Sequence, residues 1–422
     1  MMQRQSLSGF LLGAALAGAG CTAPEQPGLI AITGGLVYPV TSEPIPGGTV
    51  LIRDGKIEAV GGDVAVPRGA RVVDASGMSV IPGIIETHSH MGFKVLNLPA
   101  TGTNNNELAS PINAHVRALD GLDSNDPAFA IALAGGVTTQ NVTTGSRSPN
   151  SGQAALVKMR GGTIGDMLFG HAGMKMAIRA TTPYPGFPET EDEVFELLRG
   201  ALEAAQDYLE QLAAHHADPA ANPRPPRNLT HEALGKVLTR EWVLGIHSHS
   251  EAQMRHAMQL KRLFDLDAYI HHGSATNILA EELAELEMPV SYGPILPFDG
   301  RENEELEGPV RLAELGGLVA FHQDHPDGHQ YFLRHTASMF VRRGMPPEEA
   351  LKALTWNGAR IFHIEDRVGS LEPGKDADVV LLRGDDPLAY EALVERVFVD
   401  GVEVLHRAAG YNVFGDRVAE GW

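Results

Sequence analysis

The histidines are the residues of this sequence that could do chemistry together. Eighteen occur among 422 residues, and several gather in short clusters, one of which flanks an aspartate. The clusters are His88 with His90, His247 with His249, His271 with His272, and His322 and His325 on either side of Asp324. Imidazole suits zinc, and a carboxylate adds a hard ligand or a base. Cys21 is the single cysteine, so no cysteine site competes. The sequence therefore predicts a metal site made of histidines and Asp324.

Each cluster stands at the end of a short apolar run, and these runs alternate with helical patterns. Besides the run that ends at His88, they cover residues 137–139, 154–159, 173–178, 243–247, 269–272, 289–292 and 318–324. Eight such strands over about 250 residues are typical of a (β/α)8 TIM-like barrel. Residues i and i+2 of a strand point to the same side, so His88 and His90 can face one ion. Because barrel strands end at one face, where chemistry is done, the clusters are expected to meet there.

Short β segments flank this stretch at both ends of the chain. Asp54-Gly55 and Asp400-Gly401 each separate two β-like runs, and both residue types tolerate the positive φ of a two-residue hairpin. Two or three strands are not stable alone, so the two ends are expected to pair in one domain. The predicted fold is α/β: a metal-dependent hydrolase barrel at 81–365, a small β-sandwich domain built from 28–80 and 366–408, and a C-terminal tail at 409–422.

Residues 1–27 are predicted to be a signal peptide and linker. An apolar stretch from Leu7 to Ala19 follows Arg4, and small residues lead to Cys21. The stretch is too short for a permanent membrane helix but fits a signal core. Its end resembles a bacterial lipoprotein signal, in which the cysteine is lipidated; an ordinary cleaved signal peptide is the alternative. The expected location is exported, either periplasmic or anchored to the membrane through Cys21.

The net charge of the chain restricts the classes of molecule that it is expected to bind. The chain has 33 Lys and Arg against 53 Asp and Glu, a formal net charge of −20. A field of that sign repels phosphate backbones and anionic lipid, so no nucleic acid is expected, and no membrane contact apart from a lipid anchor. The expected partner is a small molecule. The oligomeric state is left unknown.

Two longer motifs resemble those of a known family. Val80–His90 reads VIPGIIETHSH and resembles the first-strand signature of the amidohydrolase superfamily. Gly369–Val380 reads GSLEPGKDADVV and is similar to the C-terminal signature of that superfamily. The likeness covers about residues 30–405, and the branch it indicates is that of imidazolonepropionase-related enzymes and Xaa-Pro dipeptidases. The resemblance implies a metal-dependent hydrolase that acts on carbon–nitrogen bonds.

The resemblance also assigns roles to single residues. It implies that the metal ligands are His88, His90, His247, His272 and Asp324, and that Asp324 also shuttles a proton. Two departures from the pattern matter: Glu86 stands where an aspartate is usual, and the fourth-strand segment 174–180 lacks a glutamate. One divalent ion, preferably zinc, is therefore favoured over two. A carboxylated Lys175 or Lys158 could bridge two ions, whereas an ordinary salt-bridged lysine is the alternative.

The predicted reaction is metal-assisted hydrolysis of an amide, a cyclic amide or a dipeptide-like bond. Asp324 would accept the proton of the attacking water and pass it to the leaving nitrogen, and His249 would help to stabilise the oxyanion. Arg147, Lys175 and His325 are weaker candidates for substrate binding. Two alternatives stay open: a lipoprotein that binds metal or solute without catalysis, and a deaminase of the same family.

Overall fold

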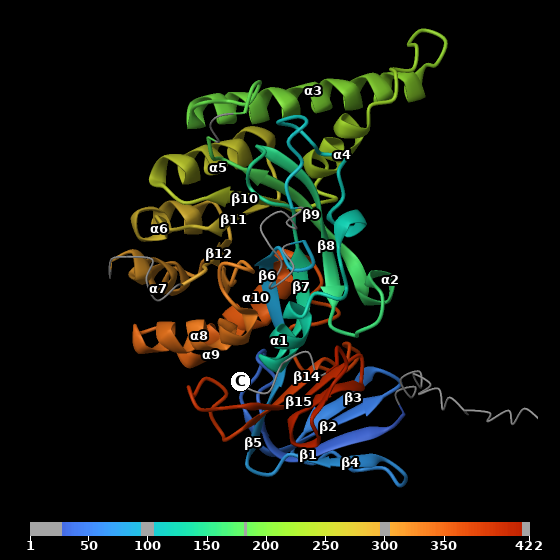
Figure 1. The fold of residues 1–422 in the computed structure, drawn as a ribbon, viewed down its shortest axis with the longest axis vertical. Helices are drawn as coiled ribbons and strands as arrows, with labels where there is room; N and C mark the ends of the chain where they lie inside the picture. The colour runs from blue at the N-terminus through green and yellow to red at the C-terminus, as the bar shows by residue number, and fades with distance from the viewer. Residues whose placement is uncertain (1–27, 94–104, 181–183, 296–303, 416–422) are drawn as a thin grey trace, which may run out of the picture.

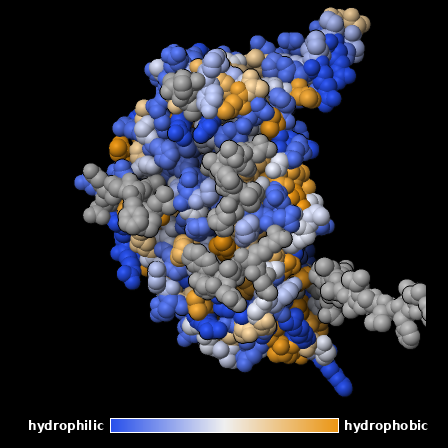
Figure 2. All heavy atoms as spheres, viewed as in Figure 1, coloured by the Kyte–Doolittle hydropathy of each residue, from blue (hydrophilic) through white to orange (hydrophobic). Residues whose placement is uncertain are grey.

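Two β-sheets organise the chain in a computed structural model that describes residues 28–93, 105–180, 184–295 and 304–415. The eight-stranded sheet forms a barrel, and the nine-stranded sheet forms a smaller domain beside it (Figure 1). The predicted signal and Cys21 lie outside the described residues. Of the helices described, none combines the length and the apolar character needed to cross a bilayer. The face shown in Figure 2 is predominantly hydrophilic, in keeping with the strong net charge.

The smaller domain is built from both ends of the chain. Its strands run in the order β17-β16-β15-β14-β5-β1-β2-β3, and β4 pairs with β1. Their bounds are β1 Ile30–Val37, β2 Ile45–Arg53, β3 Lys56–Gly61, β4 Arg71–Asp74, β5 Met78–Pro82, β14 Val379–Arg383, β15 Val394–Val399, β16 Val402–His406 and β17 Tyr411–Asn412. The two ends join where β5 runs antiparallel to β14. The sheet continues past residue 408, because β17 pairs with β16.

The two Asp-Gly pairs form the hairpins that the sequence predicts. Asp54 and Gly55 have φ values of 48° and 81° and join β2 to β3, and Asp400 and Gly401, at 49° and 74°, join β15 to β16. Positive φ at both central residues matches the right-handed twist of the paired strands. The domain has its own apolar core, in which residues of β1, β2, β5, β14 and β15 pack together.

The barrel sheet has the order β6-β7-β8-β9-β10-β11-β12-β13. Its strands are β6 Ile84–Ser89, β7 Val137–Val142, β8 Asn150–Lys158, β9 Leu168–Ala177, β10 Leu244–Ser248, β11 Ala268–His272, β12 Val290–Tyr292 and β13 Val319–Phe321. The helices are α1 Ala128–Ala134, α2 Ile164–Met167, α3 Glu191–Ala217, α4 Leu229–Leu238, α5 Glu251–Phe264, α6 Thr276–Glu285, α7 Gly308–Glu314, α8 Leu333–Arg342, α9 Pro347–Leu354 and α10 Trp356–Ile361. Each of the eight predicted apolar runs lies on one of these strands or overlaps it. The predicted fold class is therefore confirmed.

One strand departs from the regular (β/α)8 pattern. β8 runs antiparallel to both β7 and β9, whereas the other paired strands of the barrel are parallel. A parallel crossover takes a dozen or more residues, and the connections at 143–149 and 159–167 are shorter. The alternation of strands and helices is thus interrupted between β7 and β9.

Hydrogen bonds outside any β-ladder connect β6 to the chain that follows β13, at the seam where the barrel closes. Among the described strands, β13 and β6 end the sheet order and share no ladder pairing. The backbone N–H of Asp324 donates to the carbonyl of His88 over 3.2 Å, and that of His90 to the carbonyl of His325 over 3.2 Å. The buried carboxylate of Glu86 accepts from the backbone N–H groups of His88 and Gln323, at 3.1 and 3.1–3.2 Å. Glu86 therefore ties β6 to the chain that follows β13.

Candidate metal centre

The ends of β6 and β13 bring three candidate ligands together at the seam. The Nε2 atoms of His88 and His90 each lie 3.3 Å from Oδ1 of Asp324. Ligands that share one tetrahedral zinc with bonds of about 2.0–2.1 Å stand about 3.3–3.4 Å apart. The Nδ1 atom of His90 lies 2.7 Å from the carbonyl of Thr143, which leaves Nε2 of that ring with the lone pair. These three side chains have the spacing of ligands that share an ion.

A second group of three histidines lies beside the first, at the ends of β10 and β11. One ligand atom of each of His247, His249 and His272 lies within 4.8 Å of the others. The ring centroids of His247 and His272 are 4.3 Å apart, and those of His249 and His272 are 4.4 Å apart. Nε2 of His272 is 4.0 Å from Oδ2 of Asp324, so the two groups form one continuous cluster.

The backbone at two of these residues is strained. His272 and Asp324 have φ values of 73° and 52°, in the left-handed region that residues other than glycine seldom occupy. In a regular strand His271 and His272 would point to opposite sides. Here the ring of His271 packs 4.2 Å from that of His88, and the ring of His272 packs against those of His247 and His249. The strained turn lets neighbouring residues serve the same cluster.

Burial sets the protonation of the cluster. It lowers the pKa values of His88, His247 and His272 well below the ordinary value, and nearby positive groups such as Lys175 lower the pKa values of His88 and His247 further. Burial alone would raise the pKa of Asp324, but the surrounding histidines, His90 foremost, hold it below the usual value. Burial thus favours the neutral form of these three imidazoles, whereas the carboxylate of Asp324 is ionised.

These residues fit a divalent cation. Buried nitrogen and oxygen atoms that face the cluster make no hydrogen bond within the part of the chain that the structure describes; they are Nδ1 and Nε2 of His88, Nε2 of His247, Nε2 of His272 and Oδ1 of Asp324. Buried polar atoms are rarely left so without a purpose. Neutral imidazole nitrogens and one carboxylate are also the donors that zinc prefers.

The two lysines considered for carboxylation lie in different places. Lys175 on β9 is buried beside the cluster, and its Nζ is 3.2 Å from Nδ1 of His271. Burial lowers the pKa of Lys175 to about 7. Lys158 at the end of β8 instead contacts the carboxylates of Asp376, Asp378 and Asp400 at the junction with the smaller domain. A further negative charge on Lys158 would be repelled there, so only Lys175 is placed to approach an ion.

The two remaining candidates lie at the edge of the cluster. Arg147 is exposed, with Nη1 3.3 Å from the Tyr184 hydroxyl, and its neighbour Ser146 has Oγ 3.0 Å from Nδ1 of His247. His325 is buried, and its Nε2 lies 3.8 Å from Oδ2 of Asp126. Neither side chain belongs to the two groups of ligand atoms. A role for them in substrate binding stays a prediction.

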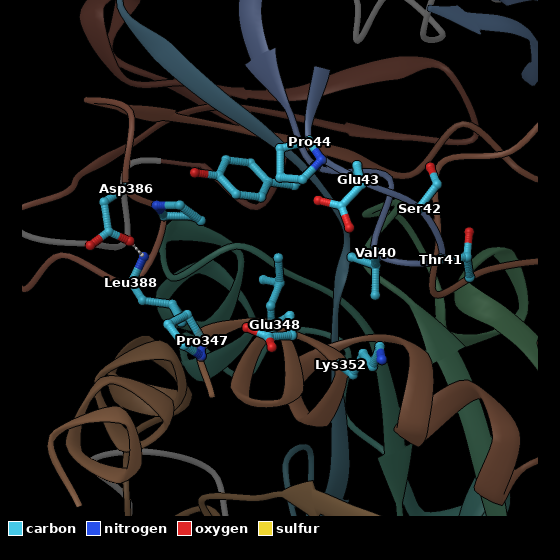
Figure 3. A pocket seen from close by; sticks show the side chains of 13 residues that line it. Val40, Thr41, Ser42, Glu43, Pro44, Pro347, Glu348, Lys352, Asp386 and Leu388 are labelled. Carbon is cyan, nitrogen blue, oxygen red and sulfur yellow. Dashed lines mark hydrogen bonds between the residues drawn. The ribbon is translucent and has the colours of Figure 1, made fainter. Parts of the chain in front are cut away.

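Two cavities of similar size lie in different parts of the described structure. One of about 470 Å³ opens beside His249 and is lined by Ser274, Asn277, Glu304 and Glu305 among others. Another, of about 500 Å³, lies between the loop that follows β1 and helix α9, where Glu43 faces Glu348 (Figure 3). No histidine lines the second cavity. Of these two cavities, the one beside His249 borders the cluster.

Several residues around the site were not singled out from the sequence. Ser146 and Ser274 orient His247 and His249, since Ser274 Oγ is 3.0 Å from Nδ1 of His249. Glu86 was noted as a departure from the usual aspartate, but its contacts across the seam were not foreseen. The serines follow strand ends, which is the available signal, yet loop serines are too common for it to be specific.

The fold and the donor set define a metal-dependent hydrolase of the kind that acts on carbon–nitrogen bonds. An amidohydrolase from Thermotoga maritima has a crystal structure that matches 90% of this chain and 100% of its own, with 32% identity and a TM-score of 0.82. The amidohydrolase family model matches residues 319–404. Among curated proteins, an imidazolonepropionase of Symbiobacterium thermophilum is 29% identical over 80% of this chain and 84% of its own. Amidohydrolase tasK of Hapsidospora irregularis is 26% identical over 86% of this chain, which spans 42% of that longer protein.

The chain belongs to the amidohydrolase superfamily, in its imidazolonepropionase-like branch. The family resemblance stated from the two end motifs is thereby confirmed. Such enzymes are metal-dependent hydrolases, and the buried histidines and Asp324 offer the plausible metal site.

Proposed function

We propose that this chain hydrolyses an amide-like carbon–nitrogen bond in a small molecule, either a cyclic amide or a dipeptide-like substrate. The observation that carries the proposal is the convergence of His88, His90, His247, His272 and Asp324, from the ends of four strands far apart in the sequence, in two adjoining groups of ligand atoms. A divalent ion bound there, zinc in our proposal, would polarise the scissile carbonyl and bring the pKa of water toward about 7.

Asp324 is the group proposed to move the proton. Burial would raise its pKa, but charge attraction from nearby groups, His90 foremost, holds the pKa below the usual value, so the carboxylate is ionised and can accept a proton from the attacking water. Oδ1 faces His88 and His90, whereas Oδ2 lies on the side of His272. A residue at this position can take the proton from water and return it to the leaving nitrogen.

His249 is proposed to act on the substrate side. Its ring borders the cavity of about 470 Å³, a size that suits a small ligand. Ser274 Oγ lies 3.0 Å from Nδ1 and fixes the orientation of the ring at the border of this cavity, where the imidazole would stabilise the negative charge that develops on the carbonyl oxygen.

The test is Asp324→Asn with hydrolysis followed on a panel of dipeptides, lactams and cyclic imides. The amide keeps the shape of the side chain but cannot accept the proton, so turnover is expected to fall by about 10²–10⁴-fold. Zinc content and circular dichroism are measured on the same preparation, since Asp324 is also a proposed ligand. His256→Gln, on a helix outside the cluster, is the matched control.

The outcomes separate the candidate functions. Unchanged turnover in Asp324→Asn at unchanged metal content would end the proton-shuttle proposal. Wild-type protein that holds zinc but hydrolyses nothing in the panel would favour a metal-binding protein without catalysis. Ammonia released from nitrogen heterocycles would assign the chain to deamination instead.

We further propose one ion per chain and an exported protein. Elemental analysis tests the first, and two ions together with a carboxyl group on Lys175 would refute it. Mass spectrometry of the mature N-terminus tests the second: a diacylglycerol on Cys21 is the expected result, and an intact Met1 on the protein in cells would refute export.

A further inference from the structure

A buried chain of hydrogen bonds runs behind the candidate metal centre and ends on one of its ligands. Thr87 on β6 has Oγ1 2.6 Å from Oγ of Ser291 on β12, and Thr87 Oγ1 donates to the carbonyl of Phe321 over 3.0 Å. Ser291 Oγ is 2.8 Å from Nδ1 of His322. Nε2 of His322 is in turn 3.3 Å from Nδ1 of His272. All four side chains are buried, so bulk water cannot supply alternative partners.

The groups at the two ends of this hydrogen-bonded network determine which atom donates in each hydrogen bond. Nδ1 of His272 lies 2.9 Å from the carbonyl of Gly293, which can only accept, so that nitrogen carries the proton. Nε2 of His322 faces this N–H and must therefore offer a lone pair. At the other end the proton of Thr87 goes to the Phe321 carbonyl, so Thr87 can only accept from Ser291.

The hydrogen bonds of this network give a consistent arrangement of protons. Ser291 gives its proton to Thr87 and accepts from Nδ1–H of His322. His322 is thus a neutral ring with its proton on Nδ1, and its Nε2 backs the N–H of His272. With its Nδ1 proton facing both the Gly293 carbonyl and Nε2 of His322, His272 turns the lone pair of its own Nε2 toward Asp324 and the cluster, as a metal ligand must.

We propose that Thr87 and Ser291 are positioning residues, which hold His322 in its Nδ1–H tautomer and thereby keep His272 oriented as a ligand. The metal itself comes from the proposed function; the tautomer does not depend on it. Without the Thr87 hydroxyl, the Ser291 proton would turn toward Nδ1 of His322. The His322 proton would then move to Nε2 and oppose the N–H of His272.

Two measurements on purified protein test the proposal. The first is the tautomer of His322 in metal-free protein, from the side-chain ¹⁵N shifts of histidine-labelled samples. The second is the affinity for Zn²⁺ in competition with a chelator. Thr87→Val and Ser291→Ala are both expected to bind Zn²⁺ about 10–100-fold more weakly, the usual cost of losing a partner behind a ligand. Thr87→Val should also shift the His322 proton from Nδ1 to Nε2.

Two controls guard against a general effect of altering the core. Thr87→Ser keeps the hydroxyl and should keep the wild-type affinity and tautomer. Thr139→Val removes a buried hydroxyl of β7 that makes no hydrogen bond within the described residues, and it should change neither. If Thr87→Val is too unstable to purify, Ser291→Ala carries the affinity test.

The results distinguish this proposal from the proposed function. A wild-type His322 with its proton on Nε2, or wild-type Zn²⁺ affinity in both Thr87→Val and Ser291→Ala, would overturn the positioning role and leave the hydrolase proposal standing. Wild-type protein that binds no Zn²⁺ would instead overturn the proposed function, and the tautomer measurement would still decide the proton order.

Discussion

Replacing Lys158 by methionine should show how firmly the barrel is joined to the smaller domain. The side chain of Lys158 is fully buried, and Nζ lies 2.7 Å from Asp376, 3.2 Å from Asp378 and 2.6 Å from Asp400. Burial alone would lower the pKa of Lys158, but the three carboxylates outweigh it and raise the pKa. The lysine is therefore charged, and methionine removes the charge while filling much the same space.

Of the three carboxylates, Asp378 loses the most stabilisation when Lys158 is replaced. Asp376 keeps Lys56 and Arg367 as partners, and Asp400 keeps Arg160. Asp378 keeps the backbone N–H of Asp400 at 2.9 Å, but it loses its ion pair with Lys158. Burial already raises the pKa of Asp378 from 3.8 to about 6. Without Lys158 this pKa should rise further, so the group would be protonated in the folded state at neutral pH.

Protonation of Asp378 limits how much the free energy of unfolding falls in Lys158→Met. Breaking a buried pair destabilises by about 3–5 kcal/mol. Protonating at pH 7 a carboxyl with an ordinary pKa of 3.8 costs about 4.4 kcal/mol, at about 1.36 kcal/mol per pH unit, and at pH 5 only about 1.6 kcal/mol. Since a raised carboxyl pKa makes the folded state bind more protons, the loss must grow as pH rises. We expect Lys158→Met to lose about 3–4 kcal/mol at pH 7 and less than about 2 kcal/mol at pH 5.

Urea unfolding of metal-free protein, followed by tryptophan fluorescence at both pH values, measures this difference. Adding Asp378→Asn to Lys158→Met should recover much of the loss at pH 7, because the stranded carboxylate is gone. Lys236→Met removes an exposed lysine 2.7 Å from Glu241 and should cost less than about 1 kcal/mol. A loss below 1 kcal/mol at pH 7, or a loss of equal size at pH 5, would refute the reasoning.

Three further predictions concern the seam, the ion and the surface. Glu86→Ala strands the N–H groups of His88 and Gln323 and should lower the free energy of unfolding by about 2–4 kcal/mol, as urea unfolding would show, whereas Glu86→Gln keeps an acceptor and should lose less. Chelation should lower the thermal midpoint and added zinc should restore it, since an ion at 100 times its dissociation constant stabilises by about 2.7 kcal/mol; a midpoint indifferent to both would argue against the site. The pKa of His363 is raised by its hydrogen bond to Asp267, at 2.5 Å, so this pair stabilises below pH 6.5 and the effect is lost as pH rises through the raised pKa. His363→Asn, which tolerates the φ of 54°, should cost under about 1 kcal/mol at pH 5.5 and nothing at pH 9 in parallel urea titrations.

The positions of the strands could be predicted from the sequence, but their directions could not. Apolar runs show where a chain is buried and carry no sign of parallel or antiparallel pairing. This is why β8 was expected to run with its neighbours. The shortness of 143–149 and 159–167 was the signal that could have corrected it, because such connections cannot hold a crossover helix.

For the candidate site, too, the sequence predicts some features and not others. Strand alternation puts His88 and His90 on one side, and the structure has both rings facing Asp324. Alternation also says that only one of His271 and His272 should face the cluster, yet both contact it. The cause is the left-handed backbone conformation of His272, which no pattern of residue types predicts. The role of His322 was open in the sequence, since it depends on hydroxyl groups of Thr87 and Ser291 that lie 235 and 31 residues away.

The position of the metal cluster in the barrel has a consequence for stability as well as chemistry. β6 and β13 end the barrel sheet without a ladder between them in the described structure; His88 lies on β6, His90 directly follows β6, and Asp324 follows β13. A ladder spreads its bonds along a strand, whereas here a few backbone bonds and the Glu86 carboxylate join the two strands. An ion held by the three ligands would cross-link β6 to β13 at the place where the sheet is least connected. Metal binding and closure of the barrel are then one event, because ligand spacing near 3.3 Å requires the two strand ends to be together. This coupling explains why chelation should loosen the fold and why Glu86, which bonds the backbone of His88 and Gln323, should affect the affinity for the ion.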